Sequence, residues 1–89
     1  MFIRRDHRLG TEEAKRRVDK VAADLGSRFN LTSRWEGDNL RFTGSGTNGH
    51  IAVTDDSVEI RLRLGLTLMM LEGPIKLAIE SSIDEYITD

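Results

Sequence analysis

The sequence contains no cysteine, which excludes disulfide bonds, thiolate metal ligands and a thiol nucleophile. It has two histidines, and strand alternation places them on opposite faces of a sheet, so we expect no metal site. The longest apolar run, residues 64–71, is interrupted by Gly65 and Thr67. A membrane-spanning helix needs about 20 apolar residues, so this run predicts no transmembrane segment. The N-terminus also lacks the apolar core of a signal peptide, and we therefore expect a cytoplasmic protein.

The length of 89 residues predicts one small domain over residues 1–89, with a thin stability margin. Self-association would cover apolar surface that so small a core leaves open, so a homodimer is one expectation. Residues 1–41 hold ten Lys and Arg against seven Asp and Glu, which gives +3, whereas residues 42–89 hold three against eight, which gives −5. This asymmetry falls well short of a nucleic-acid-binding tail.

Alternating polarity predicts a first strand over Phe2–Leu9, followed by a helix from about Glu12 to Phe29. Thr11 is a suitable N-cap, because its hydroxyl can accept a hydrogen bond from a free backbone N–H at the helix start. Apolar residues recur in the helix at three- and four-residue spacing, which indicates one face packed on a sheet. That face consists of Ala14, Val18, Val21, Ala22, Leu25 and Phe29.

Four further strand-like runs follow, and two tight turns fix their register. Gly37-Asp38 predicts a hairpin with positive φ at its first turn residue, which pairs Trp35 with Leu40. Asp55-Asp56 closes a second hairpin, and both registers gather apolar side chains on one face. The glycine-rich link over residues 44–49 lies between two strands and lacks a lysine, so it predicts a hairpin loop rather than a phosphate-binding loop.

The last third of the chain runs from an alternating strand through a nearly continuous apolar segment into an amphipathic helix. Gly65 ends the strand, and residues 66–71 (LTLMML) predict a short helix that is apolar nearly all round. The pair Gly73-Pro74 breaks the chain, with Pro74 suited to the first turn of the last helix. The apolar face of that helix consists of Ile75, Ile79, Ile83, Tyr86 and Ile87.

The element order is therefore β-α-β-β-β-β-α, with a helical turn before the last helix. Short turns force the last four strands to be antiparallel. The fold class that we expect is α+β, a two-layer sandwich in which a curved antiparallel sheet carries both helices on one face. The first strand should pair at one edge of the sheet, and either edge is open to it.

The open face of this sheet is rich in arginine. Its expected residues are Arg34, Arg41, Arg61, Arg63 and His50, offset by Glu36 and Glu59, with Arg4, Arg8 and Asp6 from the first strand. RNA-binding sheets place aromatic residues on their open face, whereas Trp35 and Phe42 are predicted on the covered face. We interpret these charges as a solvated surface, with binding of RNA or another anion as a third-ranked hypothesis.

The covered face has one polar feature, because Arg5 and His7 fall between Ile3 and Leu9. A buried charge requires a partner, so the two side chains should meet carboxylates, helix ends or a ligand. One hypothesis is a pocket between sheet and helices, near Arg5, His7 and Trp35, that holds an acyl or hydroxyacyl group. The simpler interpretation is a sheet edge at which both side chains reach water.

The apolar segment is the strongest candidate for an interaction surface. Methionine and leucine form an adaptable apolar surface suited to a protein partner, a lipid or a hydrophobic polymer. Packing of the same side chains in the core is the simpler alternative. The candidate interaction residues are Leu66, Leu68, Met69, Met70 and Leu71.

Short residue patterns along nearly the whole chain are shared with one protein family. They comprise Arg5-x-His7-x-Leu9-Gly10, Ala14, Trp35-x-Gly37-Asp38-x-Leu40-x-Phe42, Gly46-x-x-Gly49, Leu64-Gly65 and Gly73-Pro74-Ile75. In these patterns the chain resembles the small bacterial polyhydroxyalkanoic acid system proteins. The resemblance implies a cytoplasmic bacterial protein associated with polyhydroxyalkanoate storage granules, and it supplies no catalytic residues.

Two main hypotheses of function follow. The first is a non-enzymatic accessory protein, without cofactor, that meets a polyhydroxyalkanoate granule or a granule-associated protein through Leu66–Leu71. The second is a small-molecule binding domain for a hydroxyacyl-type ligand near Arg5, His7 and Trp35. No Ser or Asp of the sequence has an assembled base or orienting partner, so we do not expect an enzyme. Nucleic acid is not an expected partner.

Overall fold

The computed structural model describes residues 1–44 and 46–88, which form a sheet and three helices. In chain order the elements are β1 (Phe2–Asp6), α1 (Thr11–Phe29), β2 (Thr32–Glu36), β3 (Asn39–Gly44), β4 (Thr47–Val53), β5 (Ser57–Leu64), α2 (Leu66–Met69) and α3 (Glu72–Tyr86). The expected α+β class and element order are confirmed, including the short helical turn before the last helix.

The five strands form one antiparallel sheet in the order β1-β5-β4-β3-β2. Both predicted hairpin registers are confirmed, with Trp35 opposite Leu40 and Ile51 opposite Ile60. The turn residue Gly37 has φ 63°, which is the positive value that the first hairpin requires. The sequence did not determine at which edge of the sheet the first strand pairs. In the structure β1 pairs with β5. As a result, β1 and β2 lie at opposite edges of the sheet.

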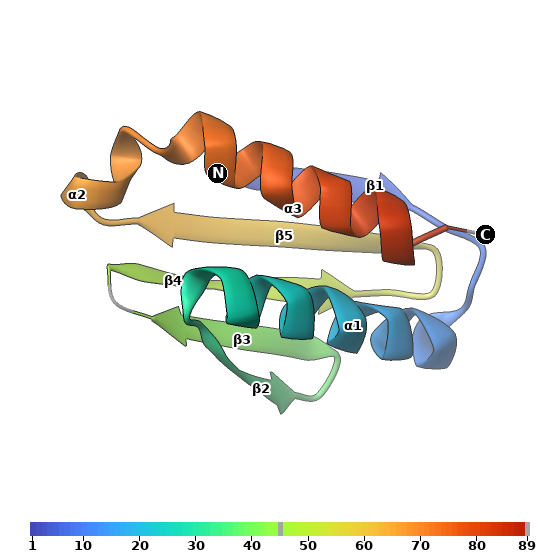
Figure 1. Ribbon diagram of the computed structural model, residues 1–89. Helices are drawn as coiled ribbons and strands as arrows, with labels where there is room; N and C mark the ends of the chain where they lie inside the picture. Colours follow the sequence, from blue (N-terminus) through green and yellow to red (C-terminus); the bar gives the residue numbers. More distant parts are fainter. Residues whose placement is uncertain (45, 89) are drawn as a thin grey trace.

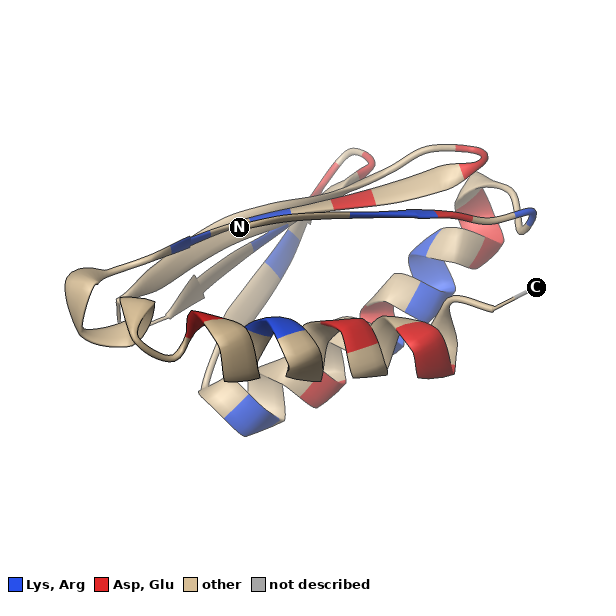
Figure 2. Cartoon of the chain, turned by 90° about the horizontal axis from the view of Figure 1, so that it is seen from above, with Lys and Arg blue, Asp and Glu red and all other residues tan. Residues whose placement is uncertain are grey.

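Helices α1 and α3 lie side by side on one face of the sheet, and the other face is open (Figures 1 and 2). Figure 1 shows the two helices close together near the C-terminus and diverging toward α2. At the close end, Arg17 of α1 donates hydrogen bonds of 3.1 Å to the carbonyl oxygens of Tyr86 and Thr88. The pairing of the helices is thus fixed at one end and left open at the other.

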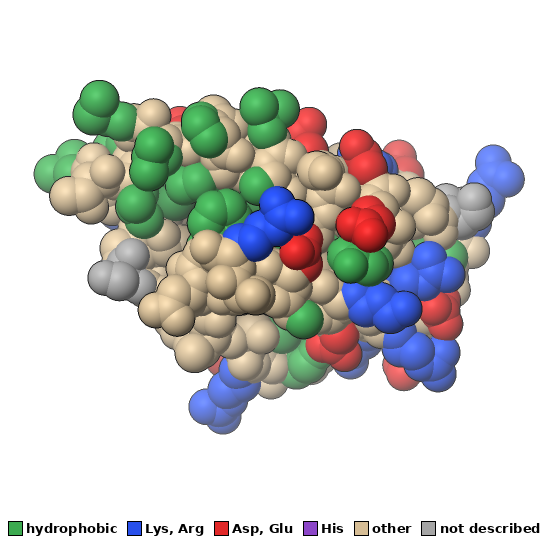
Figure 3. Space-filling model, in the orientation of Figure 1, with side chains coloured by type: hydrophobic (Ala, Val, Ile, Leu, Met, Phe, Trp, Pro, Cys, Tyr) green, Lys and Arg blue, Asp and Glu red, His purple; other side chains and the backbone are tan. Residues whose placement is uncertain are grey.

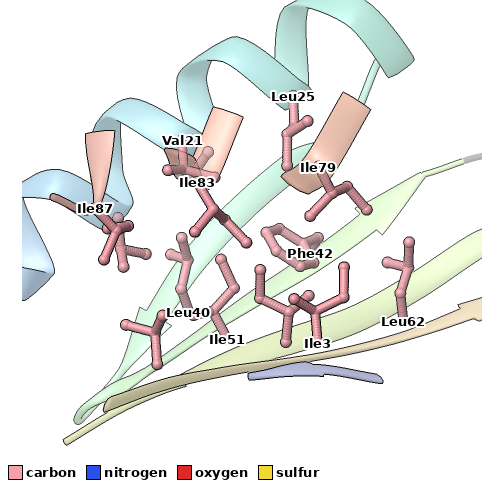
Figure 4. Packing of buried hydrophobic residues seen from close by; sticks show 14 of the residues in the cluster. Ile3, Val21, Leu25, Leu40, Phe42, Ile51, Leu62, Ile79, Ile83 and Ile87 are labelled. Atoms are coloured by element: carbon pink, nitrogen blue, oxygen red, sulfur yellow. The ribbon is translucent and has the colours of Figure 1, made fainter. Parts of the chain in front are cut away.

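The core lies between the sheet and the two long helices, where side chains from both layers meet (Figure 4). Alternate residues along the central strands point inward, as the strand period of two demands. The largest fully buried side chains are Leu40, Ile51, Ile60, Ile83, Val18, Val21 and Val58. The apolar faces predicted for both helices are confirmed, except that Phe29 at the end of α1 is 36% exposed.

Three boundaries differ from the sequence expectation. Strand β1 ends at Asp6 rather than Leu9, and α1 begins at Thr11 itself. Thr11 is therefore not the N-cap; its backbone N–H and its hydroxyl face the carboxylate of Asp55, at 3.3 and 3.5 Å. A carboxylate at this position also suits the positive end of the helix dipole. Helix α3 begins before Gly73-Pro74, so Pro74 does lie in its first turn.

The glycine-rich residues 44–49 form the end of a hairpin, as expected, but Gly44 belongs to β3 and residues 47–49 belong to β4, with Gly44 paired to Thr47; Ser45 lies outside the described residues. Gly49 is required by close packing. A Cβ atom on Gly49 would lie 2.2 Å from the carbonyl oxygen of Arg61 and 2.9 Å from the Cα atom of Leu62. Only glycine permits β4 and β5 to approach in this way.

Candidate apolar interaction surface

Helix α2 and the turn after it expose four large apolar side chains at one end of the molecule. Their exposed fractions are Leu66 87%, Met69 55%, Met70 91% and Leu71 49%. We refer to these four residues as the α2 patch. Figure 3 shows apolar side chains gathered over α2 and the adjoining part of α3. Core packing was the simpler expectation for this segment, and it is wrong for Leu66 and Met70.

The local backbone explains why these side chains stay outside. Helix α2 is a single turn of four residues, closed by hydrogen bonds from the backbone N–H groups of Leu68 and Met69 to the carbonyl oxygen of Gly65. One turn cannot point all its side chains toward the sheet, and only Leu68 is directed to the interior, where it is half-buried. Residues that are apolar on every side therefore leave an apolar outer surface.

The surroundings of the α2 patch extend its apolar character. Leu77 on the outer side of α3 is 69% exposed, and Phe29 lies at the end of α1. Residues 65–71 carry no charged side chain. An exposed, uncharged patch of leucine and methionine on a small protein is the usual mark of an interaction site.

An apolar cavity of about 190 Å³ opens beside the α2 patch, between the diverging helices and the sheet. We refer to it as the inter-helix cavity. Phe42, Ile60 and Leu62 of the sheet line it, together with Ile75 and Ile79 of α3. Its remaining lining residues are Leu25, Phe29, Leu31, Thr47, Leu64, Leu68 and Leu71. Thr47 is the one polar side chain among these described residues.

The three residues of the predicted pocket do not come together. Arg5 and His7 belong to β1 and the turn after it, whereas Trp35 lies on β2 at the opposite edge of the sheet. None of the three lines the inter-helix cavity. A cavity does lie between the sheet and the helices, but its lining residues are not the three from which the pocket was predicted.

Arg5 and Trp35 each connect one edge of the sheet to a helix. The guanidinium of Arg5 lies 2.5 Å from the carboxylate of Asp84 on α3. On the other edge, the indole N–H of Trp35 donates to the carboxylate of Asp19 on α1 at 2.7 Å. The Nζ atom of Lys15 lies 4.9 Å from the centroid of the Trp35 ring. These contacts give both residues a structural role.

His7 is buried, with 4% of its surface exposed. Its Nδ1 atom accepts a hydrogen bond from the backbone N–H of Leu9 at 3.1 Å, and its own backbone N–H donates to the carbonyl oxygen of Asp56. The Nε2 atom has no hydrogen-bond partner among the described residues. The expectation that both side chains reach water thus fails for His7, which closes the turn between β1 and α1.

Three of the arginines expected on the open face contact neighbouring carboxylates. Arg4 contacts Asp6 and Glu59, and Arg41 contacts Glu36 at 3.1 Å. Arg61 pairs with Glu59 at 3.8 Å and also stacks its guanidinium over the ring of Phe2, at 4.7 Å from the centroid. This arrangement agrees with solvated charge. Phe2, which the alternation of the first strand places on the same face as Arg4, is an exposed aromatic residue there.

The described residues show neither a membrane-spanning helix nor a metal-binding cluster. No helix within residues 1–44 and 46–88 combines the length and hydropathy needed to cross a bilayer. The same residues contain no group of three or more His, Asp or Glu side chains placed to hold a metal ion. One carboxylate is perturbed, since hydrogen bonds from Arg17 and then Arg16 lower the pKa of Glu13.

Comparison with models of known protein families gives a match over nearly the whole chain. Residues 1–87 match the profile of a family described as "Putative polyhydroxyalkanoic acid system protein". No curated protein and no solved structure matches the chain.

Proposed function

We propose that this chain, which belongs to the polyhydroxyalkanoic acid system protein family, is a non-enzymatic accessory protein of polyhydroxyalkanoate storage. In this proposal the α2 patch contacts the hydrophobic surface of a storage granule or a protein on that surface. The observation that carries the proposal is the exposure of Leu66, Met69, Met70 and Leu71 on one end of the molecule.

The free energy gained by covering the α2 patch is of the size needed for reversible adsorption. Leu66 and Met70 are each about nine-tenths exposed, so covering both would contribute roughly 3–5 kcal/mol. Association costs at least about 4 kcal/mol of lost translational and rotational freedom. Met69, Leu71 and neighbouring side chains must therefore share in the contact, and we expect adsorption to be weak for each molecule and to depend on the whole patch.

The absence of charge in residues 65–71 favours a neutral polymer over a phospholipid membrane. Peripheral helices that bind anionic membranes carry lysine and arginine beside their apolar face. Here the next residue is Glu72, which an anionic surface would repel. Adsorption to a polyester surface should consequently be insensitive to salt, because no ion pairs contribute to it.

The test is co-sedimentation of the purified protein with polyhydroxyalkanoate granules, with phospholipid vesicles as the control surface. A variant carrying Leu66→Ser, Met69→Gln and Met70→Gln removes most of the patch. The control is Phe2→Ser, which removes a large apolar residue of similar exposure to Met69, 48% against 55%, on the open face of the sheet.

We expect saturable binding of the wild-type protein and of Phe2→Ser to granules, and loss of binding in the triple variant. Binding to protein-free polymer particles then distinguishes contact with the polymer from contact with a granule protein. Retained binding identifies the polymer as the contact, and lost binding identifies a granule protein. Equal binding of the triple variant and the wild type to native granules would refute the proposal.

A further inference from the structure

The inter-helix cavity can admit only the apolar part of a ligand. Among the described residues that line its volume of about 190 Å³, only Thr47 has a side chain that can form a hydrogen bond. A polar group buried there would lose its bonds to water and find at most one partner, which is costly. Nucleotides, sugars and amino acids are therefore excluded, and hydrocarbon remains.

The cavity has a mouth on the same end of the molecule as the α2 patch. Two of its lining residues, Phe29 of α1 and Leu71 before α3, are partly exposed and so mark this opening. Its floor consists of fully covered residues of the sheet, such as Ile60 and Phe42. A ligand with one apolar and one polar end would place the polar end at the mouth, in water.

The size of the cavity sets the length of chain that it can hold. A cavity of about 150 Å³ lined by leucine, isoleucine and phenylalanine stays dry and binds benzene, which has six carbon atoms. The inter-helix cavity is somewhat larger and has the same kind of lining. We propose that it binds one linear alkyl chain of about six to eight carbon atoms, whose polar end stays at the mouth.

The alkyl chain has two sources, a free acyl or hydroxyacyl chain and the side chain of an apolar polymer. Both present the same chemistry to the cavity. The proposal does not depend on the granule contact proposed above, because it rests on the cavity rather than on the exposed patch and is tested in solution without granules.

The experiment uses methyl NMR spectra of the whole protein, titrated with butanoate, hexanoate, octanoate and decanoate. The methyl groups of Ile60, Ile75 and Ile79 line the cavity, whereas those of Ile3 and Ile51 are buried in the core away from it. We expect saturable shifts at the first three residues only. The Kd should fall by about fourfold for each added methylene, up to about six to eight carbons, and then level off.

Two variants make the test specific. Leu68→Trp enlarges a half-buried side chain that lines the cavity, while Leu66, Met69 and Met70 remain unchanged. Leu77→Trp makes the same substitution on the outer side of α3, away from the lining. Octanoate binding should weaken at least tenfold in Leu68→Trp and stay unchanged in Leu77→Trp.

The proposal would be overturned by equal affinity in Leu68→Trp and the wild type, by shifts spread evenly over all isoleucines, or by an affinity that rises as steeply from octanoate to decanoate as from butanoate to hexanoate. Shifts at Ile60, Ile75 and Ile79 that follow protein concentration without ligand would also overturn it, since a second copy would then fill the cavity. Once octanoate binding is established, particles of polyesters with pentyl or methyl side chains distinguish the sources. Displacement by the pentyl polymer alone identifies the polymer side chain, and no displacement identifies the free chain.

Discussion

Replacing the most exposed residues of the α2 patch should leave the stability of the protein nearly unchanged. The double variant Leu66→Ser, Met70→Gln removes two large apolar side chains, each of which buries only about a tenth of its surface in the folded chain. Complete burial of such a side chain contributes about 1.5–3 kcal/mol, so the two together contribute roughly 0.3–0.6 kcal/mol to folding. Removal of a core residue such as Ile83, which is 1% exposed, should cost about 2–5 kcal/mol when it is changed to Ala.

Urea unfolding followed by the fluorescence of Trp35 provides the measurement. Trp35 is the only tryptophan, and its indole N–H is bonded to Asp19 only in the folded state. We expect the double variant to unfold at nearly the wild-type urea concentration and Ile83→Ala to unfold far earlier, with similar slopes. A loss of more than about 2 kcal/mol in the double variant would show instead that Leu66 and Met70 belong to the core.

Three further predictions concern other contacts. Gly49→Ala should destabilise the fold by about 1–3 kcal/mol in urea unfolding, because its Cβ would meet the backbone of β5; an unchanged midpoint would contradict that packing. Asp84→Ala should cost less than about 1 kcal/mol, because its pair with Arg5 is partly exposed, and a larger loss in the same assay would argue for a buried pair. Arg17→Ala should raise the pKa of Glu13 toward its ordinary value in a carboxyl NMR titration, because the Arg17 hydrogen bond is the main cause of the lowering. The stabilisation contributed by Glu13 is present above the ordinary pKa and is lost as the pH falls through the lowered one, so the variant should lose the part of this acid dependence that comes from Arg17 and keep the part that comes from Arg16.

Local chemistry made much of the fold predictable. Tight turns at Gly37-Asp38 and Asp55-Asp56 determine which residues face each other, so the registers of both hairpins follow from the sequence. The helical stripes follow from spacing in the same way. The edge taken by β1 did not follow, because it depends on pairing between residues more than fifty positions apart, such as Ile3 and Ile60.

The candidate site was predictable only in part. Residues 66–71 stood out as an apolar segment, but a single helical turn has no periodicity from which an exposed side can be inferred. The inter-helix cavity depends on the divergence of α1 from α3, which no local pattern encodes. Arg5 was expected to have a carboxylate partner, and it has one in Asp84, which lies 79 positions away. The prediction that Arg5 and Trp35 line one pocket was wrong, because the two residues lie on opposite edges of the sheet.

Methionine oxidation tests most directly whether the α2 patch is the surface that contacts the granule. The three methionines are Met1, whose amino group bonds the carbonyl oxygen of Leu62, and the exposed Met69 and Met70. Free and granule-bound protein would be treated briefly with hydrogen peroxide, and sulfoxide would be quantified at each site by mass spectrometry. We expect granule binding to slow oxidation of Met69 and Met70 by about tenfold or more, which corresponds to at least ~1.4 kcal/mol of protection. Equal oxidation of Met69 and Met70 in the free and bound protein would contradict this expectation.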